Sequence, residues 1–324
     1  MMWPKFSKKS ELKRILVFSM TNIGDVVLTC PVIDILRRDF PEAKMDVVTG
    51  PKAASLFAEN PDFRVKVFDK RSSLRQKIAW FLDLYKEHYD CVVDLRRTML
   101  AFFLMPKFAT PVLFENPLKG HKKDMHLNRL RQVYYYDDPS VKQYAVLTSD
   151  EDERFYEGSV APALQGQSFV VIAPGAADSA KRWHAEGFAA VADHLSARYK
   201  VILVGDVNDV NITDDIQGRM RTSALSLAGK INLRQLAFVL KKSQWVMTHD
   251  SGVMHLACYL NKPVVALWGP TDINKYAPWG PKSVIVRRNK KCTRCQNPGS
   301  DATHNCMSFI KVEDVIEAIQ ASSF

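Results

Sequence analysis

The chain lacks an apolar run long enough to cross a bilayer. A membrane-spanning helix needs about 20 predominantly apolar residues, and the nearest candidate, residues 99–114, is interrupted by Pro106 and Lys107. A secretory signal is missing as well, because the basic residues 1–13 are not followed by an apolar core segment. We therefore expect a cytoplasmic protein that can at most be peripheral on the inner face of the inner membrane.

Glycine is scarce where a dinucleotide-binding protein needs it. The loop after the first predicted strand, residues 19–25, contains the single glycine Gly24, whereas the dinucleotide motif uses several glycines to admit a pyrophosphate. Hydride transfer on NAD is therefore disfavoured.

Acidic residues are also in deficit, since 35 Asp and Glu stand against 45 Lys and Arg and leave a net charge of +10. This surplus favours an anionic partner, and because no aromatic-and-basic recognition motif accompanies it, we expect no nucleic acid.

Short apolar strands alternate with helical patterns in both halves of the chain, which predicts the α/β class with doubly wound parallel sheets. A polar stretch at residues 137–167 interrupts the alternation. We predict two Rossmann-like domains, residues 1–160 and 161–324, with a last helix that could pack back on the first domain. Strands are predicted at residues 14–19, 45–48, 65–68, 91–95, 112–114, 169–173, 201–204, 245–248 and 264–267. Helices are predicted at residues 25–39, 53–59, 74–87, 185–198, 233–241, 253–260 and 312–319.

Doubly wound domains bind ligands at the carboxyl ends of their strands, and Asp25 follows the first strand there. One interpretation is that Asp25 caps the helix that begins at this point. The other is a general base, because a carboxylate within hydrogen-bond reach can accept the proton of an attacking hydroxyl.

Two loops of the second half suit a diphosphate. After strand 169–173, the small residues Gly175, Ala176 and Ala177 let a ligand approach the backbone closely, and Lys181 adds a positive charge. After strand 245–248, the run Asp250-Ser251-Gly252-Val253 opens a helix, whose first N–H groups form an anion site. His255 lies about one turn into that helix, where it could share a pocket with Asp250.

Four motifs together resemble the ADP-heptose:lipopolysaccharide heptosyltransferases, glycosyltransferase family 9, over residues 14–320. They are Asn22-Ile23-Gly24-Asp25 with Pro31, Pro174-Gly175 with Ala180-Lys181-Arg182-Trp183, Asp250-Ser251-Gly252 with His255, and Gly269-Pro270-Thr271-Asp272. The resemblance implies the GT-B fold, in which two Rossmann-like domains face a central cleft. It also implies a cytoplasmic enzyme of the Gram-negative cell envelope, with an N-terminal acceptor domain and a C-terminal donor domain.

The resemblance implies roles for individual residues. Asp25 corresponds to the proposed general base and Lys181 to a lysine near the diphosphate. Ile231 would contact adenine, and Asp209, or Asp206 if the match is gapped, would bind the ribose. Ala176 and Ala177 replace threonines of other members, so that backbone N–H groups must hold the phosphate. The implied donor site comprises Gly175, Ala176, Ala177, Lys181, Asp209, Ile231, Asp250, Ser251, Gly252, Val253 and His255.

The implied reaction is inverting transfer of heptose from ADP-heptose to the inner core of lipopolysaccharide, either Kdo-lipid A or a heptosyl core. Asp25 would take the proton, while Lys181 and the helix N–H groups would stabilise the leaving diphosphate. No metal or cofactor is needed. The acceptor is anionic, and Gly24, Arg96, Arg97, Lys122 and Lys123 are the residues expected to bind it. The alternatives are another nucleotide sugar or acceptor, or a nucleotide-sugar-binding protein without turnover, against which Asp25 argues.

The six cysteines fall into two groups. Cys30, Cys91 and Cys258 lie in apolar segments and are expected to be buried. The other group is Cys292-x-x-Cys295 with His304 and Cys306. Free thiols are the first interpretation, because cytosolic disulfides are uncommon. A disulfide and a structural zinc site at Cys292, Cys295, His304 and Cys306 stay open.

Overall fold

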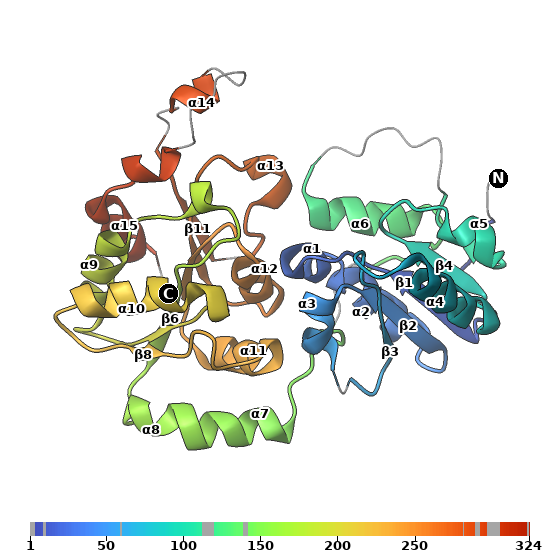
Figure 1. Cartoon of the computed structure of the whole chain (residues 1–324), viewed down its shortest axis with the longest axis horizontal. Helices are drawn as coiled ribbons and strands as arrows, with labels where there is room; N and C mark the ends of the chain where they lie inside the picture. Colours follow the sequence, from blue (N-terminus) through green and yellow to red (C-terminus); the bar gives the residue numbers. More distant parts are fainter. Residues whose placement is uncertain are drawn as a thin grey trace. The chain divides into compact units, whose positions relative to one another are not determined.

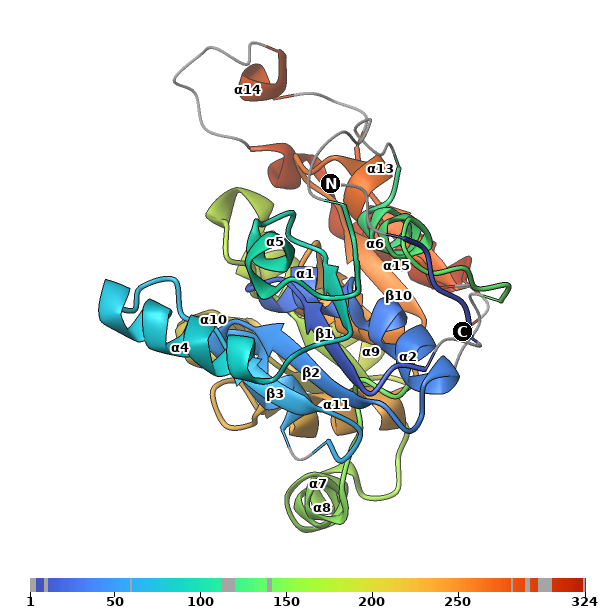
Figure 2. The same ribbon diagram turned by 90° about the vertical axis from the view of Figure 1, so that its right-hand side faces the viewer.

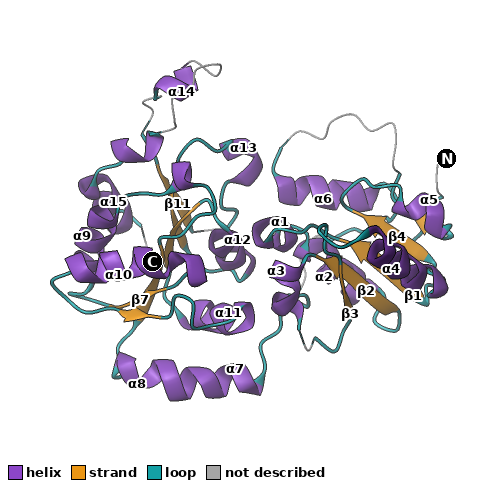
Figure 3. Cartoon of the chain, viewed as in Figure 1, coloured by secondary structure: helices purple, strands orange, loops and turns teal. Residues whose placement is uncertain are grey.

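The computed structural model divides into two compact units, Met1–Leu147 and Thr148–Phe324, and each is a parallel sheet covered by helices (Figures 1 and 3). It describes residues 4–8, 11–58, 60–111, 120–138, 142–280, 282–288, 292–296, 305–322 and 324. The predicted strand 112–114 and His304 lie outside the described residues. Within the described part of the chain, the helices are all too short or too polar to span a membrane.

The first unit contains a five-stranded sheet in the order β3-β2-β1-β4-β5. Its strands are β1 Arg14–Phe18, β2 Lys44–Thr49, β3 Arg64–Val67, β4 Cys91–Asp94 and β5 Phe108–Ala109. Central β1 pairs in parallel with β2 and β4. Parallel sheets are buried on both faces and need apolar strands, and Ile15, Leu16 and Val17 of β1 are accordingly fully buried.

Helices cover both faces of the first sheet (Figure 2). They are α1 Ile23–Val27, α2 Cys30–Asp39, α3 Pro51–Ala54, α4 Leu74–Lys86, α5 Leu100–Leu104 and α6 Lys122–Arg131, with a 3-10 turn, η1 Ser55–Phe57, after α3. Helices α4 and α5 share a core cluster with β1 through Leu84, Leu100 and Leu104. Right-handed crossovers that run in opposite directions along a sheet place their helices on opposite faces, so α2 covers the other face, where it packs against α6.

The single helix predicted at residues 25–39 is wrong, because the chain forms two helices there. Helix α1 ends at Val27 and α2 begins at Cys30. Between them, the Thr29 hydroxyl donates to Val26 O at 2.6 Å and lies 2.6 Å from the Ser19 hydroxyl. Pro31 has no N–H to continue the helical hydrogen bonds. The break turns α1 into a short segment of its own at the end of β1.

The second unit contains a six-stranded sheet in the order β11-β10-β9-β6-β7-β8, which is the doubly wound order of nucleotide-binding domains. Its strands are β6 Phe169–Ala173, β7 Lys200–Leu203, β8 Leu225–Ser226, β9 Val246–His249, β10 Val264–Leu267 and β11 Ser283–Val286. The four strands predicted in this half are confirmed to within one residue. The two outermost strands, β8 and β11, were not predicted, because they are short or only half-buried.

The helices of the second unit are α7 Asp150–Phe155, α8 Ala161–Leu164, α9 Ala185–Leu195, α10 Val210–Arg219, α11 Leu233–Lys242, α12 Gly252–Tyr259, α13 Ile273–Tyr276, α14 Thr293–Gln296 and α15 Val312–Gln320. The π-helical turn η2 Tyr156–Val160 joins α7 to α8, and the 3-10 turns are η3 Ser179–Lys181, η4 Val207–Asp209 and η5 Cys306–Phe309. The last helix, α15, packs against α9 and β11 of its own unit, and its Val315 is fully buried.

The boundary between the units falls at Leu147–Thr148, inside the polar stretch but before the predicted position at residue 160. The acidic start of α7 is typical of a solvated segment, yet α7 packs against α11. Arg234 of α11 pairs with Asp152 at 3.5 Å and with Glu151 at 3.3 Å, and Asp152 is fully buried. Because this ion pair joins α7 to α11, the residues from Asp150 onward belong to the second unit.

Candidate functional site

The loops after β6 and β9 meet where the strand order of the second sheet reverses, the usual ligand position in a doubly wound domain. Lys181 from the β6 loop donates a hydrogen bond of 2.7 Å to Asp250 Oδ2 from the β9 loop. The Asp250 side chain is buried, whereas 28% of the Lys181 side chain is exposed. The structure thus brings these two predicted residues together and leaves the lysine accessible to a ligand.

Helix α12 begins directly after this ion pair. Ser251 is its N-cap, and the Ser251 hydroxyl accepts a hydrogen bond from Met254 N at 3.4 Å. Gly252 and Val253 occupy the first turn, where N–H groups have no acceptor within the helix. The positive end of the helix dipole adds to their attraction for an anion, so this turn can bind a negatively charged group beside Lys181.

His255, one turn into α12, faces the same aspartate. Its Nε2 atom lies 3.7 Å from Asp250 Oδ1, and its ring stacks on Trp279 with a centroid distance of 5.5 Å. Asp250 is therefore held between Lys181 and His255, and the three side chains predicted at this site form one cluster.

His249, the last residue of β9, was not singled out from the sequence, and it joins the two loops. Its Nε2 atom accepts a hydrogen bond of 2.9 Å from Trp183 N, at the end of the β6 loop. Burial lowers the pKa of His249 to about 3, so that the ring is neutral near pH 7 and can act as an acceptor. A lone buried histidine has no sequence pattern of its own, and only its position at a strand end could have indicated this role.

Asp209 fills the space that two glycines leave beside the β6 loop. A Cβ on Gly175 would lie 2.2 Å from Asp209 Oδ2, and a Cβ on Gly205 would lie 2.5 Å from Asp209 Cβ. Burial raises the pKa of Asp209, and its carboxylate accepts from Asp206 N at 3.0 Å. Asp206 is exposed, and its own carboxylate accepts from Asn208 N. Of the two acids considered for the ribose, Asp209 is the one against Gly175.

The β6 loop is fixed by hydrogen bonds of its own. Arg182 Nε donates to Ala176 O at 2.8 Å, and the Asp178 carboxylate accepts from Ala180 N at 2.9 Å. Ala176 is buried, whereas Ala177 is exposed. Neither alanine has a side chain that could donate to a ligand, so the polar groups that this part of the loop presents are those of the backbone.

Ile231 lies in the loop after β8, and it is half-buried. This loop runs beside the β7 loop, because Gly229 N donates to Gly205 O at 3.0 Å. Gly229 has a φ of +68°, which favours glycine. Ile231 and Asp209 are therefore on neighbouring loops at the carboxyl ends of β7 and β8.

In the first unit, Asp25 is the third residue of α1, and the N-cap is Asn22. The interpretation of Asp25 as the cap is therefore wrong. The Asp25 carboxylate is half-buried and accepts a hydrogen bond of 3.2 Å from Asn22 Nδ2. Gly24 precedes it in the same turn. The end of β2 packs closely against the loop that precedes α1. A glycine is needed there, because a Cβ on Gly50 would lie 2.7 Å from Thr21 O.

The loop after β4 carries Arg96 and Arg97, and it is organised by Asp94, which was not singled out from the sequence. Asp94 is buried, and it accepts from Arg96 N at 2.9 Å and from Thr98 N at 2.7 Å. Burial raises the pKa of Asp94. The Arg96 guanidinium lies 5.3 Å from the ring centroid of Phe18, whereas Arg97 is exposed and has a φ of +59°. Arg96 thus packs inward, and Arg97 reaches solvent from a strained backbone position.

Lys122 and Lys123 form the first turn of α6 and are half-buried. Lys123 Nζ pairs with Asp124 at 2.6 Å. Arg129, two turns further along α6, is buried and donates to Asp94 O at 2.6 Å. Arg129 therefore connects the C-terminal end of α6 to the β4 loop, whereas Lys122 and Lys123 lie at the N-terminal end of the same helix.

Three cysteines of the second unit converge. Cys306 Sγ lies 3.3 Å from Cys292 Sγ and 3.4 Å from Cys295 Sγ, and no disulfide joins any of the described cysteines. Burial, with the two neighbouring thiols, raises the pKa of Cys306 to about 12. His304, considered as a fourth zinc ligand, lies outside the described residues.

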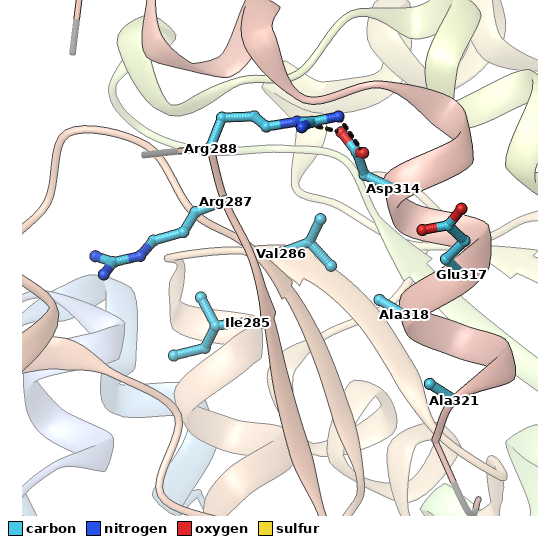
Figure 4. A pocket seen from close by; sticks show the side chains of 8 residues that line it. All are labelled: Ile285, Val286, Arg287, Arg288, Asp314, Glu317, Ala318 and Ala321. Carbon is cyan, nitrogen blue, oxygen red and sulfur yellow. Dashed lines mark hydrogen bonds and ion pairs between the residues drawn. The ribbon is translucent and has the colours of Figure 1, made fainter. Parts of the chain in front are cut away.

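A pocket of about 380 Å³ lies between β11 and α15. Arg288 and Asp314 form an ion pair across it, and Arg287 extends away from α15 (Figure 4). The pocket is at the β11 edge of the sheet, whereas the predicted donor residues follow β6 to β9. It is therefore separate from the candidate site.

The fold and the sequence of the chain both match known proteins. A family model described as glycosyltransferase family 9 (heptosyltransferase) matches residues 118–304, more than half of the chain. Lipopolysaccharide heptosyltransferase 3 of Escherichia coli is 27% identical, over 91% of this chain and 95% of its own length. The family 9 glycosyl transferase from Veillonella parvula has a TM-score of 0.77 at 24% identity, covering 95% of this chain and 96% of its own. The E. coli heptosyltransferase WaaC with ADP has a TM-score of 0.72 at 18% identity, covering 95% and 99%.

Two doubly wound parallel sheets that match these structures define the GT-B class of glycosyltransferases. Because the family model covers most of the second unit and part of the first, the assignment can be made at the level of the family. The chain belongs to glycosyltransferase family 9, the heptosyltransferases.

Proposed function

We propose that this enzyme transfers heptose from ADP-heptose to the inner core of lipopolysaccharide, with inversion at the anomeric carbon. The names of its relatives support this donor and acceptor, since one is a lipopolysaccharide heptosyltransferase and a structural neighbour was solved with ADP. The observation that carries the proposal is the Lys181–Asp250 pair, held at 2.7 Å beside the first turn of α12.

On the donor side, the leaving group is ADP, whose diphosphate gains negative charge as its bond to the sugar breaks. Lys181 and the N–H groups of Gly252 and Val253 would stabilise this charge, because preorganised donors act most strongly on charge that develops in the transition state. In this proposal the β6 backbone at Gly175 contacts the diphosphate, beside the Asp209 carboxylate that fills the space of the missing side chain. In this proposal Asp209 binds the ribose and Ile231 contacts the adenine. The other residues of the proposed donor site are Ala176, Ala177, Asp250, Ser251 and His255.

On the acceptor side, Asp25 accepts the proton of the attacking hydroxyl, and Asn22 orients its carboxylate. The acceptor oxygen bonds to the anomeric carbon as the bond to the ADP oxygen breaks. Attack opposite the leaving group inverts the configuration, and the proton ends on Asp25.

The acceptor's phosphates and carboxylates need cationic partners. Arg97 is exposed and has a left-handed backbone, and such strain at a non-glycine residue is typical of functional positions. Arg97 is therefore the first contact we propose for an anionic group of the acceptor. Gly24, Arg96, Lys122 and Lys123 are the other proposed contacts, with Arg96 acting mainly through its packing on Phe18.

The test compares ADP-heptose with UDP- and GDP-sugars on Kdo-lipid A and on heptosylated core acceptors. Release of ADP and the product mass report turnover, and the anomeric configuration of the product reports the stereochemistry. An ADP-sugar should also raise the melting temperature in proportion to the logarithm of its concentration. Equal shifts with all three nucleotides would contradict the donor assignment, and a retained configuration would contradict inversion. Binding without release of ADP would indicate a nucleotide-sugar-binding protein instead.

A further inference from the structure

We propose that Cys292, Cys295 and Cys306 bind one thiolate-coordinated transition-metal ion, with zinc as the ion that best fits the donor set. Their three sulfur atoms all lie within 4.8 Å of one another. In a tetrahedral zinc–thiolate site with Zn–S bonds of about 2.3 Å, neighbouring sulfurs are about 3.8 Å apart. The sulfurs here, at 3.3 and 3.4 Å from Cys306, would reach this geometry with small outward shifts.

Local structure explains why the sulfurs converge. Gln296 N donates to Cys292 O at 3.0 Å, which closes the helical turn of α14 and puts residues 292 and 295 on one side of it. Cys306 starts η5, 11 positions after Cys295. A disulfide joins only two sulfurs, at about 2.05 Å, whereas Cys306 is almost equally distant from both partners. This threefold convergence favours a shared ion over a disulfide, and it leaves one tetrahedral position for another donor, water included.

The cluster is connected to the donor loop through η5. Met307 of η5 is buried against Gly269, where a Cβ would lie 2.8 Å from Met307 Sδ. Ile310 O, directly after η5, accepts from Trp183 Nε1 at 3.0 Å. Because η5 also packs on η3, which ends at Lys181, a bound ion would fix η5 and, through it, the loop that carries Lys181.

The experiment measures metal in the full-length protein, purified under reducing conditions without a metal-affinity tag. We expect about one zinc or iron ion per chain by elemental analysis. After removal and reconstitution with Co²⁺, we expect the sulfur-to-cobalt charge-transfer absorption of a tetrahedral thiolate site. Cys292→Ser and Cys306→Ser should lose both signals. Cys30→Ala, which removes a buried thiol in the first unit, should keep both.

Melting curves of each variant establish that it is folded, and if Cys292→Ser does not fold, the half-buried Cys295→Ser replaces it. Folded wild-type protein that holds no metal and shows no cobalt absorption would overturn the proposal. So would a peptide map showing a disulfide between two of the three cysteines in fresh cell extract. These readouts do not depend on heptosyl transfer, so the proposal can fail without affecting the proposed function.

A second inference concerns the outer face of α4. Leu74, Ile78, Leu82 and Tyr85 follow helical spacing along one side of this helix, and between 40% and 72% of each residue is exposed. The stripe continues onto α5, because the ring of Phe81 on α4 packs against the ring of Phe103 on α5, with 6.3 Å between the ring centroids. We call this set, with its α5 neighbours, the α4–α5 apolar surface. Its exposed members are Leu74, Ile78, Leu82, Tyr85, Met99, Phe102, Phe103 and Met105.

We infer that the α4–α5 apolar surface inserts into an anionic lipid bilayer, an inference that rests on the proposed lipid-linked acceptor. Exposed patches of several large apolar side chains mark interaction sites. The charged residues beside this patch indicate which kind of partner it binds. Arg75 and Lys86 are exposed and lie next to the stripe on the turn of α4, while Lys107 is exposed just after α5. An amphipathic helix with basic residues at the edge of its apolar face binds anionic membrane interfaces.

The test uses vesicles of phosphatidylcholine alone and vesicles that also contain phosphatidylglycerol. We expect flotation with the anionic vesicles only, weakening as salt rises. The variant Ile78→Glu with Leu82→Glu should bind at least tenfold more weakly. The matched control, Gln76→Glu with Ala79→Glu, adds the same charge on exposed positions outside the stripe and should bind nearly as wild type. Equal loss of vesicle binding in both double variants would overturn the inference. The inference would also be overturned if the wild-type protein were a dimer and Ile78→Glu with Leu82→Glu converted it to a monomer.

Turnover separates this inference from the function it rests on. With a water-soluble core oligosaccharide, both double variants should react as wild type, whereas with vesicle-bound acceptor only Ile78→Glu with Leu82→Glu should be slow. If the proposed function fails, neither acceptor reacts, yet vesicle binding still tests the surface.

Discussion

The two units share a doubly wound plan but differ in how firmly the residues proposed for catalysis are held at their strand ends. In the second unit, Lys181 and Asp250 are joined at 2.7 Å, and His249 fixes the β6 loop to β9 through Trp183. In the first unit, Asp25 has one hydrogen bond of 3.2 Å, from a residue of its own loop. The proposed donor side is therefore built in advance of its ligand, whereas the proposed base has freedom to adjust to the acceptor.

The strongest way to test this contrast is Asp25→Asn. The change removes the base but keeps the side-chain volume, and Asn22 still occupies the N-cap position of α1. We expect a rate loss on the order of 10²–10⁴, the usual contribution of a positioned base. The melting temperature should change little, because a first-turn carboxylate contributes only about 0.3–1 kcal/mol. Donor affinity should be unchanged. Glu42→Gln, an exposed charge removal in the same unit, is the control, and activity within a few-fold of wild type would remove Asp25 from the mechanism.

The next largest effect is expected for Lys181→Ala. Loss of one preorganised donor to a developing anion typically lowers turnover by about 10²–10³. Asp250 would also lose its 2.7 Å partner and keep His255 at 3.7 Å. Single-turnover kinetics and donor titration measure the two consequences separately. Lys282→Ala, an exposed lysine of the same unit, should behave as wild type. Unchanged kinetics and donor affinity in Lys181→Ala would show that the ion pair is only structural.

Gly175→Ala tests how tightly the donor side is packed. Its Cβ would lie 2.2 Å from the Asp209 carboxylate, which must then move. We expect at least a tenfold loss in donor affinity and a destabilisation of about 1–3 kcal/mol, typical of overpacking. Gly218→Ala, on the exposed side of α10 with nothing within 4 Å of its Cβ position, should instead gain up to about 1 kcal/mol. Calorimetric titration with ADP and urea unfolding would measure both, and equal affinities would disprove the tight fit.

The effect that is smallest near pH 7 is a pH dependence that both units should share. Burial lowers the pKa of His249 to about 3 and that of His126, on α6, to about 4. Both values lie below the unfolded value of about 6.5. The neutral rings therefore stabilise the fold above pH 6.5, and this stability is lost as the pH falls towards the folded values. Each histidine should contribute up to about 1.4 kcal/mol per pH unit within that window.

Urea unfolding between pH 7 and 4.5 measures this slope. His249→Gln should reduce the slope of stability against pH for the second unit, and His126→Gln should reduce it for the first. The control His194→Gln, at an exposed site on α9, should leave the slope unchanged. A slope unaltered in His249→Gln would mean that folding does not lower the pKa of His249.

Strand ends were the most predictable part of the molecule. A buried strand followed by small or capping residues is a local pattern, and it located β1, β6, β9 and β10 together with Asp25 and Lys181. What could not be predicted depends on partners distant in sequence. Asp152 looks solvated until Arg234, on α11, pairs with it. His249 and Asp94 resemble any strand-end polar residue until the loops they organise are seen. Convergence of Cys306 with Cys292 likewise depends on folding, because the spacing alone also fits a disulfide or separate thiols.

Gly175 follows β6, Gly205 and Asp209 both follow β7, and the Asp209 side chain limits the size of both glycines. Neither glycine can enlarge without displacing Asp209, since Asp209 already occupies the volume that either glycine would need. If Asp209 first became alanine, its carboxylate would vanish and Gly175 could then accept a methyl group, whereas the reverse order meets a clash. Substitutions at these positions are therefore ordered in time, with loss of the Asp209 carboxylate before a change at Gly175. Gly205 stays constrained even then, because a Cβ at Gly205 would lie 2.5 Å from the Cβ of residue 209.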